Sequence, residues 1–394
     1  MKTISRYNGI KVFFKLLMLT LIVSSVGTLT SCRGGERTEA FSESLYRPEE
    51  ASGFEILGSP GSASVLIRSA APWQGADSTD YRELLILRGG EDIPSDFKGQ
   101  VLKGNAERVI CMSSGHIAML SLLGNIDNIV GGSSLDFVSS PEIQSRRGEL
   151  AEVGFEGAID YEALVAARPD LVILYGVNSA NPMEARLADL GIPYIYIGDY
   201  LEQSPLGKAE WMVALGECLG KREEAVARFQ PIKKNYLAMK QRVNEAKDRR
   251  RPKVMLNGPY GDQWMMPSAD NYIVRLISDA GGEYIYPENM TGASQPISRE
   301  LALRLASASD RWLNVGNGYD SFESLRSGLP LMASTEVVKK GEVYNNTKRS
   351  TIAGGNDFYE SGIVNPDLIL RDMIKIMYPD LVSEPFFYYR RLTQ

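Results

Sequence analysis

The chain has 394 residues, of which 44% are hydrophobic, so it is long enough for two domains. It carries 49 acidic and 43 basic side chains, which give a formal net charge of −6. Because an acidic surface repels phosphate backbones, this charge balance argues against a nucleic acid partner.

The first 31 residues have the three-part plan of a secretory signal. Four basic side chains and no acidic one come first, followed by an apolar run over 16–26 and small residues up to Cys32. This run is shorter than the ~20 apolar residues that a membrane-spanning helix needs. The sequence therefore predicts a signal peptide over residues 1–31, and its removal would take the net charge from −6 to −10.

Residues 29–32 (LTSC) resemble the lipobox of bacterial lipoproteins, in which the cysteine becomes the lipidated first residue of the mature chain. This implies lipidation at Cys32 and an exported protein anchored to a bacterial membrane, in the periplasm or at the cell surface. Ordinary cleavage near Ser31, which leaves Cys32 as a free thiol, stays open as the alternative. Residues 32–45 are expected to be a polar, glycine-rich tether, and residues 46–105 a small antiparallel β extension.

From Arg108 short apolar runs alternate with helical patterns, which predicts parallel strands with helices on both faces. The predicted fold class is α/β, with two doubly wound lobes joined by a long helical segment. We expect an N-lobe over 106–204, connecting helices over 205–250 with breaks near Gly220 and Pro231, and a C-lobe over 251–394. Strands are expected at 109–112, 129–130, 171–174, 194–197, 254–256 and 312–315, and helices at 117–123, 161–167, 183–190, 272–279, 299–305 and 366–377.

Ligands of open parallel sheets bind beyond the carboxyl ends of the strands. In this chain each predicted strand exit pairs glycine with Tyr, Trp, His, Asn or Asp, whose flat faces and polar tips suit a large planar or amphipathic ligand. These residue types are also common in ordinary turns, but five such exits in two lobes favour a binding cleft. The expected ligand-binding residues are Ser113, Ser114, His116, Tyr175, Asn178, Tyr200, Tyr260, Trp264, Asn317, Tyr319, Asn356 and Asp357.

His116 is the only histidine in the chain and stands at a predicted helix start, with Ser113 and Ser114 as candidate caps. Its open roles are an axial ligand to iron or cobalt, a ligand contact that does not bind the metal, or an ordinary helix-start residue. A carrier of bare Zn²⁺ or Mn²⁺ would supply two or three histidines, so we expect no metal site and no cofactor of the protein's own. Cys111 and Cys218 are expected to be buried thiols, although a disulfide between them stays open.

We expect no enzymatic activity and assign no catalytic residues. The sequence has no Gly-x-Ser-x-Gly elbow and no Walker-type loop. A Ser-His-Asp triad on His116 or a carboxylate pair such as Asp357 and Glu360 is not excluded by sequence. Two alternatives therefore stay open: a surface-anchored enzyme acting on a glycan or cofactor, which turnover of candidate ligands would reveal, and a bare metal-ion carrier, which zinc retained through dialysis would reveal.

From about Arg108 to its end the chain resembles the periplasmic binding proteins of the iron-siderophore, heme and vitamin B12 ABC importers. The similarity is carried by residues 167–173 (ARPDLVI), 298–301 (SREL) and 354–362 (GGNDFYESG). It implies a monomeric substrate-binding protein that captures a metal chelate and delivers it to an ABC permease subunit. In this family a surface glutamate of each lobe docks into a basic pocket of the permease, and Glu184 and Glu300 match that pair by position. Each is also explained as an acid favoured by a helix dipole.

Overall fold

The computed structural model describes residues 40–77, 79–155, 157–246, 248–261 and 263–393. The predicted signal peptide, Cys32 and the first part of the predicted tether lie outside these ranges. Within them, no helix has the length and apolar character needed to cross a membrane. All elements described below belong to one unit, residues 38–394.

A five-stranded sheet forms the N-terminal extension, and its strands lie side by side in chain order. Pairing is antiparallel from β1 to β4, as the sequence predicted, and β5 adds one parallel pair with β4. The sheet begins inside the predicted tether. Its strands are β1 (Glu43–Tyr46), β2 (Phe54–Gly58), β3 (Val65–Ala70), β4 (Tyr81–Leu87) and β5 (Gln100–Lys103).

Both faces of this extension sheet are buried. Alternate side chains, among them Ile56 and Ile67, pack into the same core as the N-lobe. The opposite face is covered by Phe41 and Phe97. Because one face belongs to the N-lobe core, the extension is an integral part of the fold.

Two buried carboxylates fix the extension to the connecting helices. Glu210 is fully buried and accepts hydrogen bonds at 2.7–3.0 Å from the backbone N–H groups of residues 49–51, and another from the Tyr46 phenol. Glu202 accepts from the N–H groups of residues 52–53 at 2.9 and 3.1 Å. These carboxylates satisfy backbone donors that would otherwise be buried without partners.

The N-lobe is a parallel sheet in the order β12-β11-β6-β7-β8. Its central strands are continuous apolar runs, as strands covered on both faces require. The elements are β6 (Val109–Cys111), α2 (Ser114–Leu122), η1 (Ile126–Asn128), β7 (Ile129–Gly132), η2 (Leu135–Phe137), α3 (Pro141–Ser145), β8 (Ala151–Glu152), β9 (Gly154–Phe155), β10 (Ala158–Ile159), α4 (Tyr161–Ala166), β11 (Leu171–Leu174), α5 (Met183–Asp189), β12 (Tyr194–Tyr196) and η3 (Asp199–Leu201).

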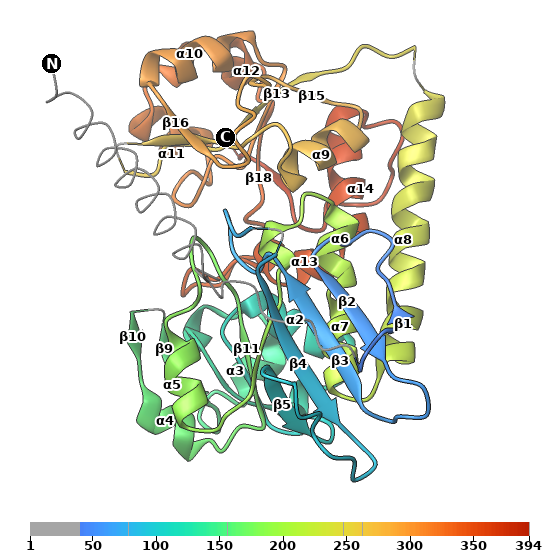
Figure 1. Cartoon of the computed structure of the whole chain (residues 1–394). Coiled ribbons are helices and arrows are strands. Elements are labelled where there is room, and N and C mark those ends of the chain that lie inside the picture. Colours follow the sequence, from blue (N-terminus) through green and yellow to red (C-terminus); the bar gives the residue numbers. More distant parts are fainter. Residues whose placement is uncertain (1–39, 78, 156, 247, 262, 394) are drawn as a thin grey trace, which may run out of the picture. The chain divides into compact units, whose positions relative to one another are not determined.

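The connecting segment consists of α6 (Pro205–Glu210), α7 (Met212–Cys218) and α8 (Arg222–Glu245). A break at Gly220 is confirmed, since this residue has a positive φ of 70° after α7. The expected break at Pro231 is wrong, because α8 continues through it. Buried Phe229, Ile232 and Tyr236 hold this helix against its neighbours, and Figure 1 shows α8 running alongside both lobes.

The C-lobe sheet has the order β15-β13-β17-β18-β19, in which only the β18–β19 pair is antiparallel. A separate small sheet pairs β14 with β16. Cys111 and Cys218 are buried free thiols, so they do not pair with each other. The C-lobe elements are β13 (Lys253–Leu256), β14 (Trp264–Met266), α9 (Tyr272–Asp279), β15 (Glu283–Tyr284), β16 (Gln295–Ile297), α10 (Arg299–Ala308), β17 (Arg311–Leu313), α11 (Phe322–Gly328), η4 (Met332–Ser334), α12 (Glu336–Lys339), β18 (Val343–Asn345), η5 (Asp357–Tyr359), α13 (Ser361–Val364), α14 (Pro366–Met377) and β19 (Arg390–Arg391).

The two lobes share one strand order. In the N-lobe the strands β7-β6-β11-β12 are neighbours, and the edge strand β8 is left out of this comparison. Of these four in chain order, the second, β7, lies on one side of the first, β6, while the third and fourth, β11 and β12, lie on the other side. In the C-lobe β15-β13-β17-β18 repeats this arrangement. Helix α4, which precedes β11, is therefore the topological equivalent of α10, which precedes β17, and α5 is the equivalent of α11.

Candidate ligand-binding face

The loops after the N-lobe strands lie against the C-lobe. Glu360 of the C-lobe is buried, and its carboxylate accepts the backbone N–H groups of Ser139 and Ser140 at 2.6 and 2.9 Å. Gly355 lies so close to this loop that an added Cβ would be 1.9 Å from the Phe137 carbonyl oxygen. Residues 133–140 thus meet residues 354–360. We call this junction, together with the strand exits at 175–178 and 197–200, the binding face, because it is the candidate ligand site.

Three half-exposed aromatic side chains belong to this face. Phe137 and Tyr200, after β7 and β12, are both 55% exposed, and Tyr359 from the C-lobe is 50% exposed. Burial, and then the neighbouring Tyr359, Asp199 and Tyr200, raise the pKa of the Tyr272 phenol, which shows that these groups from both lobes are close together. Tyr200 was expected here, whereas Phe137 and Tyr359 were not. The flat apolar faces of all three rings, with phenol groups at the tips of the two tyrosines, are suited to a planar ligand.

His116 lies beneath the binding face and is fully buried. Neither ring nitrogen has a hydrogen-bond partner among the described residues, and the ring centroid is 6.5 Å from that of Tyr175. Burial lowers the pKa of His116 to about 4, so the imidazole is neutral. The ring is therefore sealed from a ligand in this conformation. Ser113 caps α2 by accepting the Gly115 N–H at 3.2 Å, as expected.

Glu360 and Asp357, considered above as a carboxylate pair, both have structural partners. Burial raises the pKa of Glu360 to about 7, with a smaller contribution from the charge of Asp357. Asp357 is buried and pairs with Arg349, and the side chain of Asn356 accepts the Phe358 N–H at 3.1 Å. Asn356 and Asp357 therefore shape the segment that carries Tyr359, with their polar ends already engaged.

The remaining predicted residues differ in how far their side chains are exposed. Asn178, Tyr260 and Asn317 are exposed, Tyr319 is half-buried and Trp264 is buried. Trp264 is wrong as a ligand contact, because it is 2% exposed and stacks on Trp312 with ring centroids 5.8 Å apart. After β13 the chain turns back into β14, which begins at Trp264 and directs the indole into the C-lobe core.

Glu184 is corrected as a docking residue. Its side chain is only 18% exposed, pairs with Arg82 of the extension at 3.1 Å and accepts the phenols of Tyr194 and Tyr196. A carboxylate with three partners inside the chain is not available to a basic pocket of another protein. The equivalent position to α5 in the C-lobe is α11, so Glu184 and Glu300 also lack matching places in the two lobes.

Glu162 occupies the position that matches Glu300. Each glutamate is exposed and is the second residue of its helix, α4 or α10. Each helix is capped in the same way, since Asp160 accepts the Ala163 N–H at 2.9 Å and Ser298 accepts the Leu301 N–H at 3.2 Å. In the sequence, this position is marked by a helix-capping residue, Asp160 or Ser298, two positions before the glutamate. The helix that it begins precedes β11 in the N-lobe and β17 in the C-lobe.

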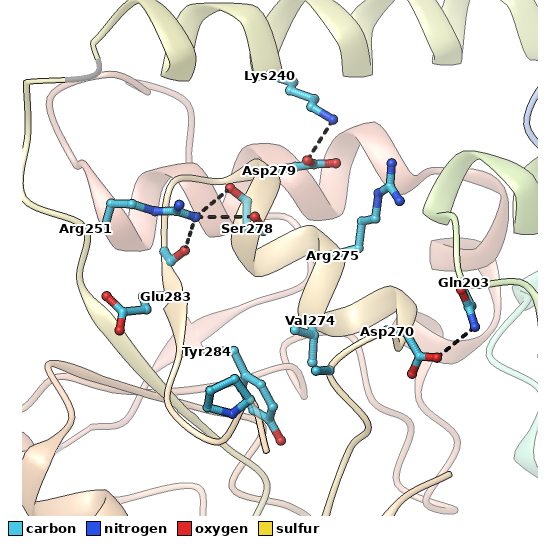
Figure 2. Close-up of a pocket in the computed structure, with 13 residues that line it drawn as sticks. Gln203, Lys240, Arg251, Asp270, Val274, Arg275, Ser278, Asp279, Glu283 and Tyr284 are labelled. Carbon is cyan, nitrogen blue, oxygen red and sulfur yellow. Dashed lines mark hydrogen bonds and ion pairs between the residues drawn. The ribbon is translucent and has the colours of Figure 1, made fainter. Parts of the chain in front are cut away.

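A groove of about 590 Å³ lies along α9, and Gln203, Lys240 and Arg251 also line it (Figure 2). Two contacts join residues that line it: Lys240 pairs with Asp279 at 2.9 Å, and the Gln203 amide donates to Asp270 at 3.0 Å. Within the described ranges, no three His, Cys, Asp or Glu side chains converge in a way that could hold a metal ion.

Comparisons with known proteins agree with this architecture. A family model described as "Periplasmic binding protein" matches residues 109–349. Two uncharacterized lipoproteins of Methanocaldococcus jannaschii are similar: one is 25% identical over 302 residues, covering 74% of this chain and 69% of its own. The other is 22% identical over 329 residues, covering 78% of each chain.

Solved structures share the fold at low sequence identity. A periplasmic heme-binding protein from Pseudomonas aeruginosa has a TM-score of 0.57 and 17% identity, and the match covers 73% of this chain and 99% of that one. The periplasmic heme-binding protein HutB of Vibrio cholerae has a TM-score of 0.52 and 15% identity, with 67% and 98% covered. The predicted fold class and family are confirmed, and the match over residues 109–349 shows that the chain belongs to the periplasmic binding protein family.

Proposed function

We propose that this protein is the substrate-binding component of an ABC importer and that it captures a bulky metal chelate, namely an iron-siderophore, heme or cobalamin. The observation that carries the proposal is the set of half-exposed aromatic side chains, Phe137, Tyr200 and Tyr359, contributed by both lobes at their junction. Two similar structures are named as heme-binding proteins, which supports this class of ligand. Binding, docking and release need no chemical step, so the protein acts as a carrier.

Removal of an aromatic ring from the binding face should weaken binding of the chelate. Tyr200→Ala and Tyr359→Ala are each expected to raise the Kd by roughly 10- to 100-fold if the rings are central contacts. Titration with hemin, cyanocobalamin and ferrichrome, followed by absorbance, identifies the chelate and measures the change. Leu237→Ala, at an exposed position on α8, is the matched control. Wild-type affinity in both tyrosine variants would place the site elsewhere.

We also propose that the chain is held at the membrane by lipid on Cys32. The similar lipoproteins of Methanocaldococcus jannaschii support this. Cys32→Ala should move the protein from the membrane to the soluble fraction, because more than one acyl chain is needed for stable anchoring and this cysteine would carry them. Labelling with a fatty acid analogue measures the lipid directly. Equal labelling of wild type and Cys32→Ala would contradict the lipidation.

The partner that receives the chelate is an ABC permease subunit, and the chain meets it as a monomer. The exposed glutamates at matching helix starts, Glu162 and Glu300, are the docking pair that we propose in place of Glu184 and Glu300. One carboxylate in each lobe would contact a separate cationic pocket of the permease.

A further inference from the structure

Residues 71–77, between β3 and β4 of the extension, pack against the loop that follows β11. The backbone N–H of Gln74 donates to the Val177 carbonyl at 2.8 Å. At Gly176 an added Cβ would lie 2.6 Å from the Pro72 carbonyl oxygen. Segment 71–77 therefore supports the strand exit that carries Tyr175.

A stack of side chains holds this segment in place. The ring of Trp73 lies 4.9 Å from the Arg82 guanidinium and meets the Tyr196 ring edge-on, with centroids 6.3 Å apart. Arg82 is itself fixed by its ion pair with Glu184 at 3.1 Å. Trp73 therefore joins the segment to both the extension and the N-lobe.

The side chain of Gln74 also reaches the C-lobe. Its Nε2 donates to the Gly292 carbonyl at 3.3 Å. The turn that contains Gly292 is fixed by buried Asn289, which donates to the carbonyls of Met266 and Ala293 at 3.2 and 2.9 Å. In Figure 1 one end of the antiparallel β3–β4 pair points toward the C-lobe, in agreement with this contact. One short segment thus contacts the N-lobe strand exit and the C-lobe together.

We propose that segment 71–77 is a third wall of the ligand site and that the hydrogen bond from Gln74 to Gly292 slows release of the bound chelate. This deepens the proposed function and rests on it. The extension precedes residue 109, where the family match begins, so this wall is an addition to the part of the chain that the family model describes. On this proposal, a ligand that leaves past Tyr175 separates Gln74 from the C-lobe.

The test measures the rate at which hemin leaves the full soluble chain, followed by its transfer to excess apomyoglobin. Gln74→Ala should release hemin roughly 3- to 10-fold faster, as expected for the loss of one hydrogen bond, with an unchanged midpoint of thermal unfolding. Gln74→Glu should release it at least as fast, because a carboxylate is repelled by the Gly292 carbonyl. Binding of hemin should also slow hydrogen exchange of the peptide that spans 71–77.

Gln203→Ala is the matched control. Gln203 Nε2 donates to Asp270 at 3.0 Å, so it too links a segment before α6 to the C-lobe, but at the groove of Figure 2. This variant should release hemin at the wild-type rate. If both variants release hemin equally faster than the wild type, the loss of any contact between the lobes speeds release. This result would overturn the proposal that segment 71–77 is a third wall.

The two proposals fail in different ways. If the wild type binds none of hemin, cyanocobalamin and ferrichrome, the proposed function fails and the third wall fails with it. If the wild type binds hemin but Gln74→Ala releases it at the wild-type rate, only the third wall is overturned.

Discussion

Replacement of Glu210 by alanine should destabilise the protein by about 3–5 kcal/mol, because it leaves buried backbone donors without partners. Its carboxylate accepts three consecutive N–H groups, of residues 49–51, and the Tyr46 phenol. The expected path of failure is detachment of the segment before β2, so limited proteolysis should cut near residue 50. Urea unfolding followed by circular dichroism measures the free energy.

Two further variants make the Glu210 result specific. Glu210→Gln keeps one acceptor oxygen and should fall between wild type and Glu210→Ala. Glu223→Ala removes an exposed glutamate from the first turn of α8 and should change stability by less than about 0.5 kcal/mol. An unfolding midpoint of Glu210→Ala equal to that of the wild type would contradict the anchoring role of this carboxylate.

Removal of both docking carboxylates should nearly abolish uptake while ligand affinity stays at the wild-type value. Loss of one charge from a desolvated contact leaves the cations of the permease unpaired and costs about 2–5 kcal/mol per site. Hydrogen bonds from its own backbone N–H and from Ser298 lower the pKa of Glu300, so this carboxylate is charged at neutral pH, as the proposed docking requires. The double variant Glu162→Ala with Glu300→Ala should therefore bind the chelate and fail to deliver it.

Charge-reversal variants and a control glutamate make the docking test specific. Glu162→Arg and Glu300→Arg should each reduce uptake more than the alanine variants, since repulsion replaces lost attraction. Glu323→Ala, an exposed glutamate in the first turn of α11, should transport normally. Uptake by the double alanine variant at the wild-type rate would refute the docking pair, and loss of ligand binding would assign these residues to the ligand site.

The regular elements were predictable where local signals are strong. Helices Tyr272–Asp279 and Pro366–Met377 and strand Leu171–Leu174 have the bounds that were expected, because a cap, a proline at the first turn or a continuous apolar run marks them. Strands β15 (Glu283–Tyr284) and β18 (Val343–Asn345) were missed, since each contains a polar residue and so is not a continuous apolar run. The continuation of α8 through Pro231 depends on packing against other elements, which a local pattern does not contain.

The residues of the proposed ligand site were predictable only in part, for a related reason. Tyr200 and Tyr175 follow strands whose ends define the face, so their place could be deduced from the order of strands. Trp264 failed because the sequence does not show that a new strand, β14, begins at this residue and pairs with β16. Glu184 failed because its partner Arg82 lies 102 residues earlier in an extension whose contacts no local signal reveals.

Uptake of a radiolabelled chelate by cells that lack the gene tests the central claim most directly. The cells should carry the importer and be supplied in turn with wild type, Tyr200→Ala with Tyr359→Ala, or Glu162→Ala with Glu300→Ala. Wild type should restore uptake of heme, cobalamin or a ferric siderophore, the tyrosine variant should fail through lost binding, and the glutamate variant should fail with binding intact. Unchanged uptake of all three ligands without the gene, or conversion of a ligand to product by the purified protein, would contradict a carrier.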